Sequence, residues 1–362
     1  GIKKIVLGGF IFLIAALPVL AWKAGNDPID FSLRPEWVAF LNLTLFRHIF
    51  ALIGTYPATW LIVLSGLCAL GLFFIADKFT TPVEASNTVR IFIWAGIIVM
   101  TVNVITVNWL PVTIIIQSQI ARVGLWTLIL AYIYFAHLLS TMYKSVDLSR
   151  NSYWFLFISY VLSPLPIIPF LVWFFTRYIK NNSLIKSIQF ITAAAIAVCV
   201  VTFLYLGFWH PGIYVYGENT PWIDVQRWAR NNTPVNAKFI TPPEKWGVQE
   251  PDWRVHSERG SAGTLSELLV AAFQPGYEIE WKQRFNILAP GALDKFNGDY
   301  FWNVEITRKA YERLTEQQLK KAACELNSQY IVHEKPVNFN LPIAYENSSF
   351  IVFDLNNVSC NQ

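Results

Sequence analysis

The stretch FITPPEKWGVQEPDWRVHSERG, residues Phe239 to Gly260, holds the densest group of side chains that could bind an anion. An arginine guanidinium can pair with a carboxylate or phosphate through two parallel hydrogen bonds. An acceptor or glycan site is one interpretation, and a salt-bridged loop with aromatic packing is the other. The candidates are Arg254, His256, Glu258 and Arg259, with Arg284 further along in EIEWKQRF.

Three basic residues flank apolar runs and are candidates to bind a lipid phosphate. Arg122 follows TIIIQSQIA at the mouth of an apolar segment, and Arg47 and His48 lie in TLFRHIFALIGTYPATW. An arginine at membrane depth is costly in free energy and normally has a partner or ligand. Snorkelling of the side chain to the lipid headgroups is the alternative.

Asp27 and Asp30 in GNDPIDF are the candidate catalytic carboxylates. Such a pair can act as a general base or bind Mg²⁺ or Mn²⁺. Turn formation is the favoured alternative, because Asn-Asp-Pro is a turn-forming sequence.

The sequence contains no motif for a His/Cys metal site, for nucleotide binding or for a serine nucleophile. There is no CxxC or HExxH, and the five histidines are scattered, so a His/Cys metal site is not expected. GxGxxG, P-loop and GxSxG motifs are missing too, and no nucleic-acid partner is expected. The cofactor is left open, apart from the divalent ion that the aspartates could hold.

The elements that must position these residues fall into two units. The chain is 54% hydrophobic and only 14% charged, against about 25% charged in ordinary soluble domains. The charged residues are sparse before residue 208 and mostly basic, whereas residues 209–362 have a water-soluble composition with a small acidic excess. We therefore expect a multi-pass α-helical membrane domain over 1–208, followed by a small extracytoplasmic α/β domain over 209–362.

About five to seven spans are expected in the membrane domain, each near the roughly 20 residues that cross a bilayer. Three further segments are ambiguous: 37–53, 111–120, which is too short to span, and 153–176. Segment 153–176 contains SPLPIIP, which should break a helix. The expected spans are Lys4–Trp22, Tyr56–Ala76, Thr88–Val107, Arg122–Tyr143 and Leu184–Phe208.

Positive charges orient the membrane domain. One arrangement places the basic loops inside, with 37–53 and 108–121 facing outward and 153–176 forming a broken hairpin. The alternative counts 37–53 and 153–176 as full spans, which gives seven. In both, Arg177, Lys180 and Lys186 precede the last span, so the C-terminal domain is expected outside.

Several elements are expected in the C-terminal domain. AKFIT, SQYIVHEK and SSFIVFDL predict strands, and PWIDVQRWARNN and TEQQLKKAACELN predict helices, the second with Thr315 and Gln318 in a capping box. Together they favour a three-layered domain with a partly parallel sheet. Its two cysteines, Cys324 and Cys360, could form a disulfide or stay as free thiols.

The sequence resembles the C-terminal half of GT-C type membrane glycosyltransferases, in particular an uncharacterised bacterial multi-pass branch. The resemblance rests on FRHIFALIGTYPATW, on IIIQSQIARVGLW, and on the tail from PWIDVQRWARNNTPVNAKFITPP to SSFIVFDL. It covers most of the chain, through degenerate motifs.

The resemblance implies a polyprenyl-phosphate sugar donor, used on the outer side of the cytoplasmic (inner) membrane. Such enzymes carry a catalytic carboxylate in their first outer loop. The chain starts at Gly1 rather than Met, so we expect a fragment whose catalytic carboxylate lies upstream, unless Asp27 and Asp30 substitute for it. The competing hypothesis is a non-enzymatic envelope protein whose outer domain binds a glycan or a protein.

Overall fold

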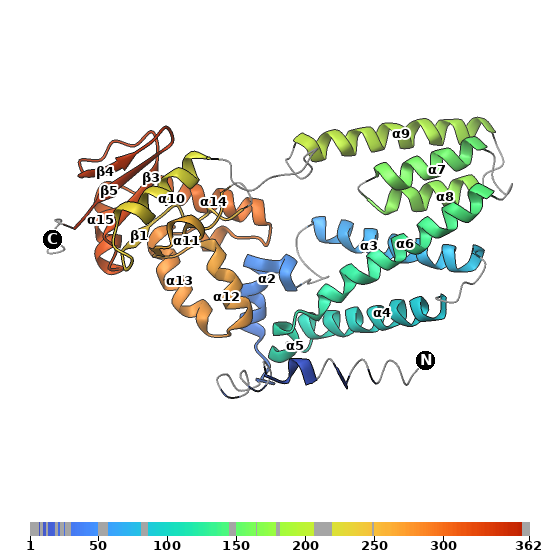
Figure 1. The fold of residues 1–362 in the computed structure, drawn as a ribbon, viewed down its shortest axis with the longest axis horizontal. Helices are drawn as coiled ribbons and strands as arrows, with labels where there is room; N and C mark the ends of the chain where they lie inside the picture. Colours follow the sequence, from blue (N-terminus) through green and yellow to red (C-terminus); the bar gives the residue numbers. More distant parts are fainter. Residues whose placement is uncertain are drawn as a thin grey trace.

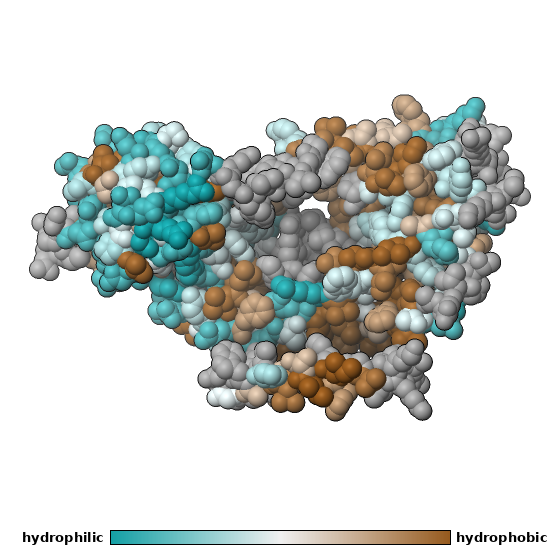
Figure 2. Space-filling model, in the orientation of Figure 1, coloured by the Kyte–Doolittle hydropathy of each residue, from teal (hydrophilic) through white to brown (hydrophobic). Residues whose placement is uncertain are grey.

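The computed structural model describes residues 30–49, 57–80, 86–144, 150–163, 165–178, 182–205, 219–247 and 250–356, with isolated positions between 7 and 25. These residues form two lobes (Figure 1). The helix lobe consists of α3, α4 and α6 to α9. The sheet lobe consists of α2 and everything from α10 onward. Hydrophobic side chains dominate the visible face of the helix lobe and hydrophilic ones that of the sheet lobe (Figure 2).

The helix lobe contains three described segments that are long and apolar enough to cross a membrane: Ser86–Asn108, Val123–Tyr143 and Lys186–Tyr205. They lie within α4, α6 and α9. The predicted span 56–76 falls in α3, another 23-residue helix, and 4–22 lies mostly outside the described residues. The bounds are α3 (Pro57–Phe79), α4 (Ser86–Asn108), α5 (Thr113–Gln117), η1 (Ile120–Arg122), α6 (Val123–Lys144), α7 (Arg150–Leu162), α8 (Ile167–Tyr178) and α9 (Asn182–Tyr205).

Segment 153–176 is a broken hairpin, as the first arrangement predicted. The helix α7 ends at Leu162, α8 starts at Ile167, and the two pack against each other. The prolines of SPLPIIP explain the break, because proline removes a backbone donor and clashes with the preceding turn. The seven-span alternative is therefore wrong for this segment.

Close helix crossings hold the helix lobe together. At Gly96 of α4, an added Cβ would lie 2.0 Å from Thr127 Oγ1 of α6, and at Gly71 of α3 it would lie 2.5 Å from the Phe170 ring of α8. These glycines let the helices approach closely, as small residues do in membrane proteins.

The ends of α3 and α8 and the starts of α4 and α9 lie at the end of the helix lobe away from the sheet lobe (Figure 1). The described basic residues of these helices fall near these ends: Lys78, Arg90, Arg177 and Lys186. Arg90 binds Asp77 at 2.7 Å, and Lys78 and Arg177 both lie over the Phe79 ring. This arrangement agrees with the expectation that the basic loops share one side.

The sheet lobe has a five-stranded sheet in the order β2-β1-β3-β5-β4. Strand β1 pairs in parallel with β2 and β3, and β5 is antiparallel to β3 and β4. The three expected strands are confirmed as β1, β3 and β5, whereas β2 and β4 were not predicted. The bounds are β1 (Lys238–Ile240), β2 (Gly260–Ser261), β3 (Tyr330–Glu334), β4 (Ile343–Glu346) and β5 (Phe350–Asp354).

Helices cover both faces of the sheet, which confirms three layers. Alternate residues of one strand point to opposite faces: Phe239 faces a core with α10 and α11, and Ile240 faces one with α13 to α15. The expected capping box of Thr315 and Gln318 begins α15. The bounds are α10 (Pro221–Asn232), α11 (Trp253–Ser257), η2 (Leu265–Glu267), α12 (Leu268–Phe273), α13 (Tyr277–Leu288), η3 (Leu293–Lys295), α14 (Tyr300–Glu312) and α15 (Glu316–Glu325).

Helix α2 (Pro35–Ile49) packs into the sheet lobe, although it precedes most of the helix lobe in sequence. Trp37 Nε1 donates to the Ala271 carbonyl at 2.8 Å, and the Phe40 ring lies 5.8 Å from that of Trp281. Asn303 donates to the Leu43 carbonyl at 2.8 Å. Segment 37–53 is therefore not a full span over its described part, and the sheet lobe extends beyond the expected division at residue 208.

Candidate functional site

Arg122 is an exposed candidate at the last residue of η1, where the chain turns into α6. Its backbone N–H donates to the Gln119 carbonyl at 3.0 Å. Among the described residues, none accepts a hydrogen bond from the Arg122 guanidinium. Beside it, Gln119 is buried with a φ of 48°, and its Oε1 has no described partner. Within the described part of the chain, the Arg122 guanidinium therefore remains available to a ligand.

The segment that carries Arg122 packs against α4 of the helix lobe and is hydrogen-bonded to α12 of the sheet lobe. Thr113 Oγ1 donates to the Ser32 carbonyl at 2.8 Å, and Leu33 and Val112 form a β-bridge just before α5. On the other side, Gln117 Nε2 donates to the Phe273 carbonyl of α12 at 2.7 Å. We call residues 112–122, with 30–34 beside them, the rim.

Asp30 lies in the rim and makes local contacts. Its carboxylate accepts from the Ser32 N–H at 2.7 Å and from Arg34 Nε at 3.0 Å. The hydrogen bonds from Ser32, followed by the interactions with Arg34, lower the pKa of Asp30. These are the contacts of a turn, the alternative that the sequence favoured. Asp27 lies outside the described residues, as do the side chains of Arg47 and His48.

Two predicted anion-binding arginines meet at a carboxylate of the protein itself. Glu267 is buried, and it accepts from Arg254 at 3.2 Å and from Arg284 at 3.1 Å. The Tyr277 hydroxyl donates at 3.3 Å to Glu267 Oε2, the same oxygen that accepts from Arg284. Burial raises the pKa of Glu267, against the opposing charges of Arg284 and Arg254. The two arginines are brought together as expected, but the fold supplies their anion.

Arg259 is a buried structural side chain. Its guanidinium donates to the Arg230 carbonyl at 2.5 Å and to the Thr233 carbonyl at 2.7 Å, which satisfies the C-terminal end of α10. The neighbouring Glu258 forms an exposed ion pair with Arg230 at 3.0 Å. His256 is half-buried, and its backbone N–H donates to Gln226.

Two of the predicted loop residues lie away from the carboxyl end of β1, the edge at which α/β sheets usually bind ligands. Glu258 and Arg259 directly precede β2, which runs parallel to β1, and therefore lie at the amino ends of these strands. The short helix α11 inside the loop carries the chain back across the sheet.

The carboxyl ends of β1 and β3 instead hold a cluster that sequence reasoning missed. Glu244 and Lys245 follow β1, and Glu334 ends β3. Lys245 Nζ lies 4.0 Å from Glu244 Oε1 and 2.7 Å from Glu250 Oε1, and it contacts Glu334. We call Glu244, Lys245, Glu250 and Glu334 the carboxyl-edge cluster. Ligands of α/β sheets usually bind at this edge. Glu244, Lys245 and Glu250 lie in the stretch quoted at the start, directly after a predicted strand, and that position was the available signal.

Burial sets the electrostatics of the carboxyl-edge cluster. It raises the pKa of Glu244 to about 7, although the charge of Lys245 opposes this. For Lys245, burial would lower the pKa, but the hydrogen bonds and charges of Glu250 and Glu334 raise it overall. Glu244 Oε2 has no described partner. A carboxyl group that titrates near neutral pH can exchange a proton under physiological conditions.

Cys324 is disulfide-bonded, whereas its expected partner Cys360 lies outside the described residues; Cys68 and Cys199 are free. Within the described part of the chain, no group of three or more His, Cys, Asp or Glu side chains is placed to hold a metal ion.

No protein-family model, curated protein or solved structure matches this chain.

Proposed function

We propose that this chain is all or part of a membrane glycosyltransferase that takes a sugar from a polyprenyl-phosphate donor on the outer side of the cytoplasmic membrane. Arg122 carries the proposal. Its guanidinium is exposed at the junction of the lobes and has no partner among the described residues, while the rim that holds it packs against α4 and is hydrogen-bonded to α12.

The chemistry of the rim suits a lipid phosphate. A lipid-linked substrate presents its phosphate where the apolar helices end, and α6 begins directly after Arg122. An arginine donates to phosphate oxygens through a planar fork, and such charge-assisted bonds are about twice as strong as neutral ones. The rim thus supports binding of the donor, whereas the residue that performs the transfer is left open between Asp27, Asp30 and a carboxylate upstream.

The test is binding of a polyprenyl monophosphate to the full chain in nanodiscs made of neutral lipid. We expect Arg122→Ala to weaken binding by roughly tenfold or more, as loss of a charge-assisted hydrogen bond should. Lys186→Ala, at the opposite end of the helix lobe, is the matched control and should change little. Unchanged binding in Arg122→Ala would remove the basis of the proposal.

The alternative is a non-enzymatic envelope protein whose sheet lobe binds a glycan or a protein. A fragment that starts after α9 cannot test it fairly, because α2 is part of the sheet lobe's core. The fair test adds residues 30–49 to residues 219–356 through a flexible linker. Glycan binding by this fusion, together with full function of Arg122→Ala in cells, would favour the alternative.

A further inference from the structure

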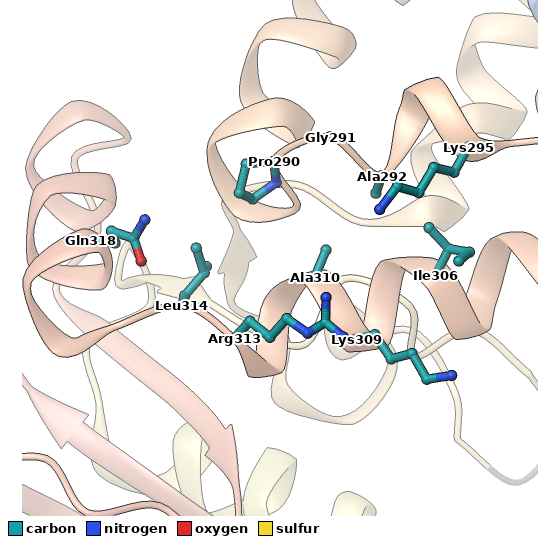
Figure 3. A pocket seen from close by; sticks show the side chains of 10 residues that line it. All are labelled: Pro290, Gly291, Ala292, Lys295, Ile306, Lys309, Ala310, Arg313, Leu314 and Gln318. Carbon is teal, nitrogen blue, oxygen red and sulfur yellow. The ribbon is translucent and has the colours of Figure 1, made fainter.

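A pocket on the sheet lobe lies between the loop that follows α13 and the outer face of α14 (Figure 3). Its volume is about 340 Å³, at the small end of the range for ligand pockets. The floor is aliphatic, with buried Ala292 and Leu314 beside Ile306 and Ala310. Such a floor suits a small ligand that is partly apolar.

Three cations line the pocket, and two of them lack a counter-charge. Lys309 pairs with Glu305 at 2.9 Å. Among the described residues, no carboxylate lies within ion-pair distance of Lys295 or Arg313. Figure 3 shows these two side chains directed toward the middle of the pocket near Ala310, and Lys309 directed away from it. Like charges that converge without an acid repel each other, and a bound anion would relieve this repulsion.

The pocket adjoins an aromatic edge. Trp302 Nε1 donates to the Lys295 carbonyl at 2.9 Å, and the side chains of Phe301 and Trp302 are 47% and 48% exposed. These residues begin α14, and Asn303 of the same turn binds the Leu43 carbonyl near the end of α2. Helix α14 lies on the side of the sheet lobe that faces the helix lobe (Figure 1). Exposed aromatic residues in such a position are typical of membrane interfaces.

From this arrangement we propose that the pocket binds a phosphate monoester, with Lys295 and Arg313 holding the phosphate and the aliphatic floor holding the adjoining part of the ligand. The group could come from a lipid headgroup at the interface or from a soluble phosphate ester. The pocket shares no residue with the rim, so the inference does not depend on the proposed transfer reaction.

The experiment is calorimetric titration of the full chain in neutral detergent. The probes are dihexanoyl phosphatidic acid, dihexanoyl phosphatidylcholine and glycerol 3-phosphate. Binding of phosphatidic acid alone supports the phosphate site with a lipid source, and binding of glycerol 3-phosphate as well supports it with a soluble source. Failure of both phosphate monoesters to bind, or equal binding of phosphatidylcholine, overturns the proposal.

Variants assign the binding to the pocket. The double variant Lys295→Gln/Arg313→Gln should weaken binding by about tenfold or more, because two charge-assisted contacts are lost. Ala310→Leu should weaken it similarly by filling the floor while keeping both cations. Lys321→Gln on α15, which is paired only loosely with Glu325 at 3.7 Å, is the matched control. If the double variant and Ala310→Leu bind phosphatidic acid as the wild type does, the site is not this pocket.

Discussion

At the scale of single residues, Glu244 should make the stability of the sheet lobe depend on pH. Its pKa rises from 4.5 in the unfolded chain to about 7 in the fold. Between these values the unfolded chain has released a proton that the folded chain keeps, so stability falls as pH rises from about 4.5 to about 7. The loss amounts to about 3 kcal/mol. Below pH 4.5 this contribution is constant.

Glu244→Gln should remove this dependence, because the amide does not titrate. Thermal unfolding followed by tryptophan fluorescence at several pH values between 4.5 and 8 measures the effect. We expect the variant to gain stability relative to wild type as pH rises. Glu325→Gln, on the exposed face of α15, serves as a control. Parallel pH profiles for wild type and Glu244→Gln would show that the buried carboxyl is not responsible.

Arg259 should matter for stability and not for binding. Lysine at this position could not reach all the acceptors that the guanidinium contacts through three nitrogens, because its donors lie on a single nitrogen. We expect Arg259→Lys to lower the free energy of unfolding by about 2 to 4 kcal/mol. The exposed Arg308→Lys should change it by less than about 1 kcal/mol. Equal stability of the two variants, measured by denaturant unfolding, would contradict the structural role.

At the scale of elements, a side chain at Gly96 should destabilise the crossing of α4 and α6. A Cβ there meets Thr127 Oγ1 at 2.0 Å, whereas one at Gly66 of α3 meets nothing within 4 Å. Overpacking of this kind costs about 1 to 3 kcal/mol. We expect Gly96→Ala to lower the midpoint of thermal unfolding in detergent, and Gly66→Ala to leave it unchanged or raise it. The reverse order would mean that the helices do not cross as described.

The docking of α2 on the sheet lobe gives a second prediction at this scale. Trp37 is only 3% exposed, so Trp37→Ala removes a buried ring and a hydrogen bond to Ala271. Such truncations cost about 3 to 5 kcal/mol. Trp60→Ala on α3 removes a ring that is 60% exposed and is the matched control. Limited proteolysis should cleave the sheet lobe of Trp37→Ala faster than that of the control, and equal rates would argue against the docking.

For the whole molecule, the proposed orientation predicts which side of the membrane each lobe faces. Cysteine introduced by Lys321→Cys in the sheet lobe should react with an impermeant maleimide in intact cells. Lys186→Cys, at the basic end of the helix lobe, should react only after permeabilisation. The unsubstituted chain gives the background from its native cysteines. Labelling in the opposite order would place the sheet lobe inside the cell.

Local patterns made part of this molecule predictable. Short runs rich in Ile, Val, Phe and Tyr predicted β3 and β5, and AKFIT predicted β1. Thr315 and Gln318 marked the start of α15, and the prolines of SPLPIIP marked the break between α7 and α8. Strand β2 has only two residues and leaves no such pattern.

Long-range pairing explains the other differences. The apolar sequence pattern of α2 does not show whether this helix packs against lipid or against α12 and α13. The sequence could place Arg254 and Arg284 near an anion but could not show that Glu267 provides it, since ion pairing depends on how α11, α12 and α13 pack.

The docking of α2 also imposes an order on biogenesis. Trp37 and its acceptor Ala271 are separated by 234 positions, and at about 5 to 20 residues per second the ribosome needs roughly 10 to 50 s to make the chain between them. During that time the whole helix lobe is synthesised, and the apolar face of α2 cannot yet pack against α12 and α13. The sheet lobe therefore completes its core late, and a chaperone at the membrane surface would have that interval in which to shield α2.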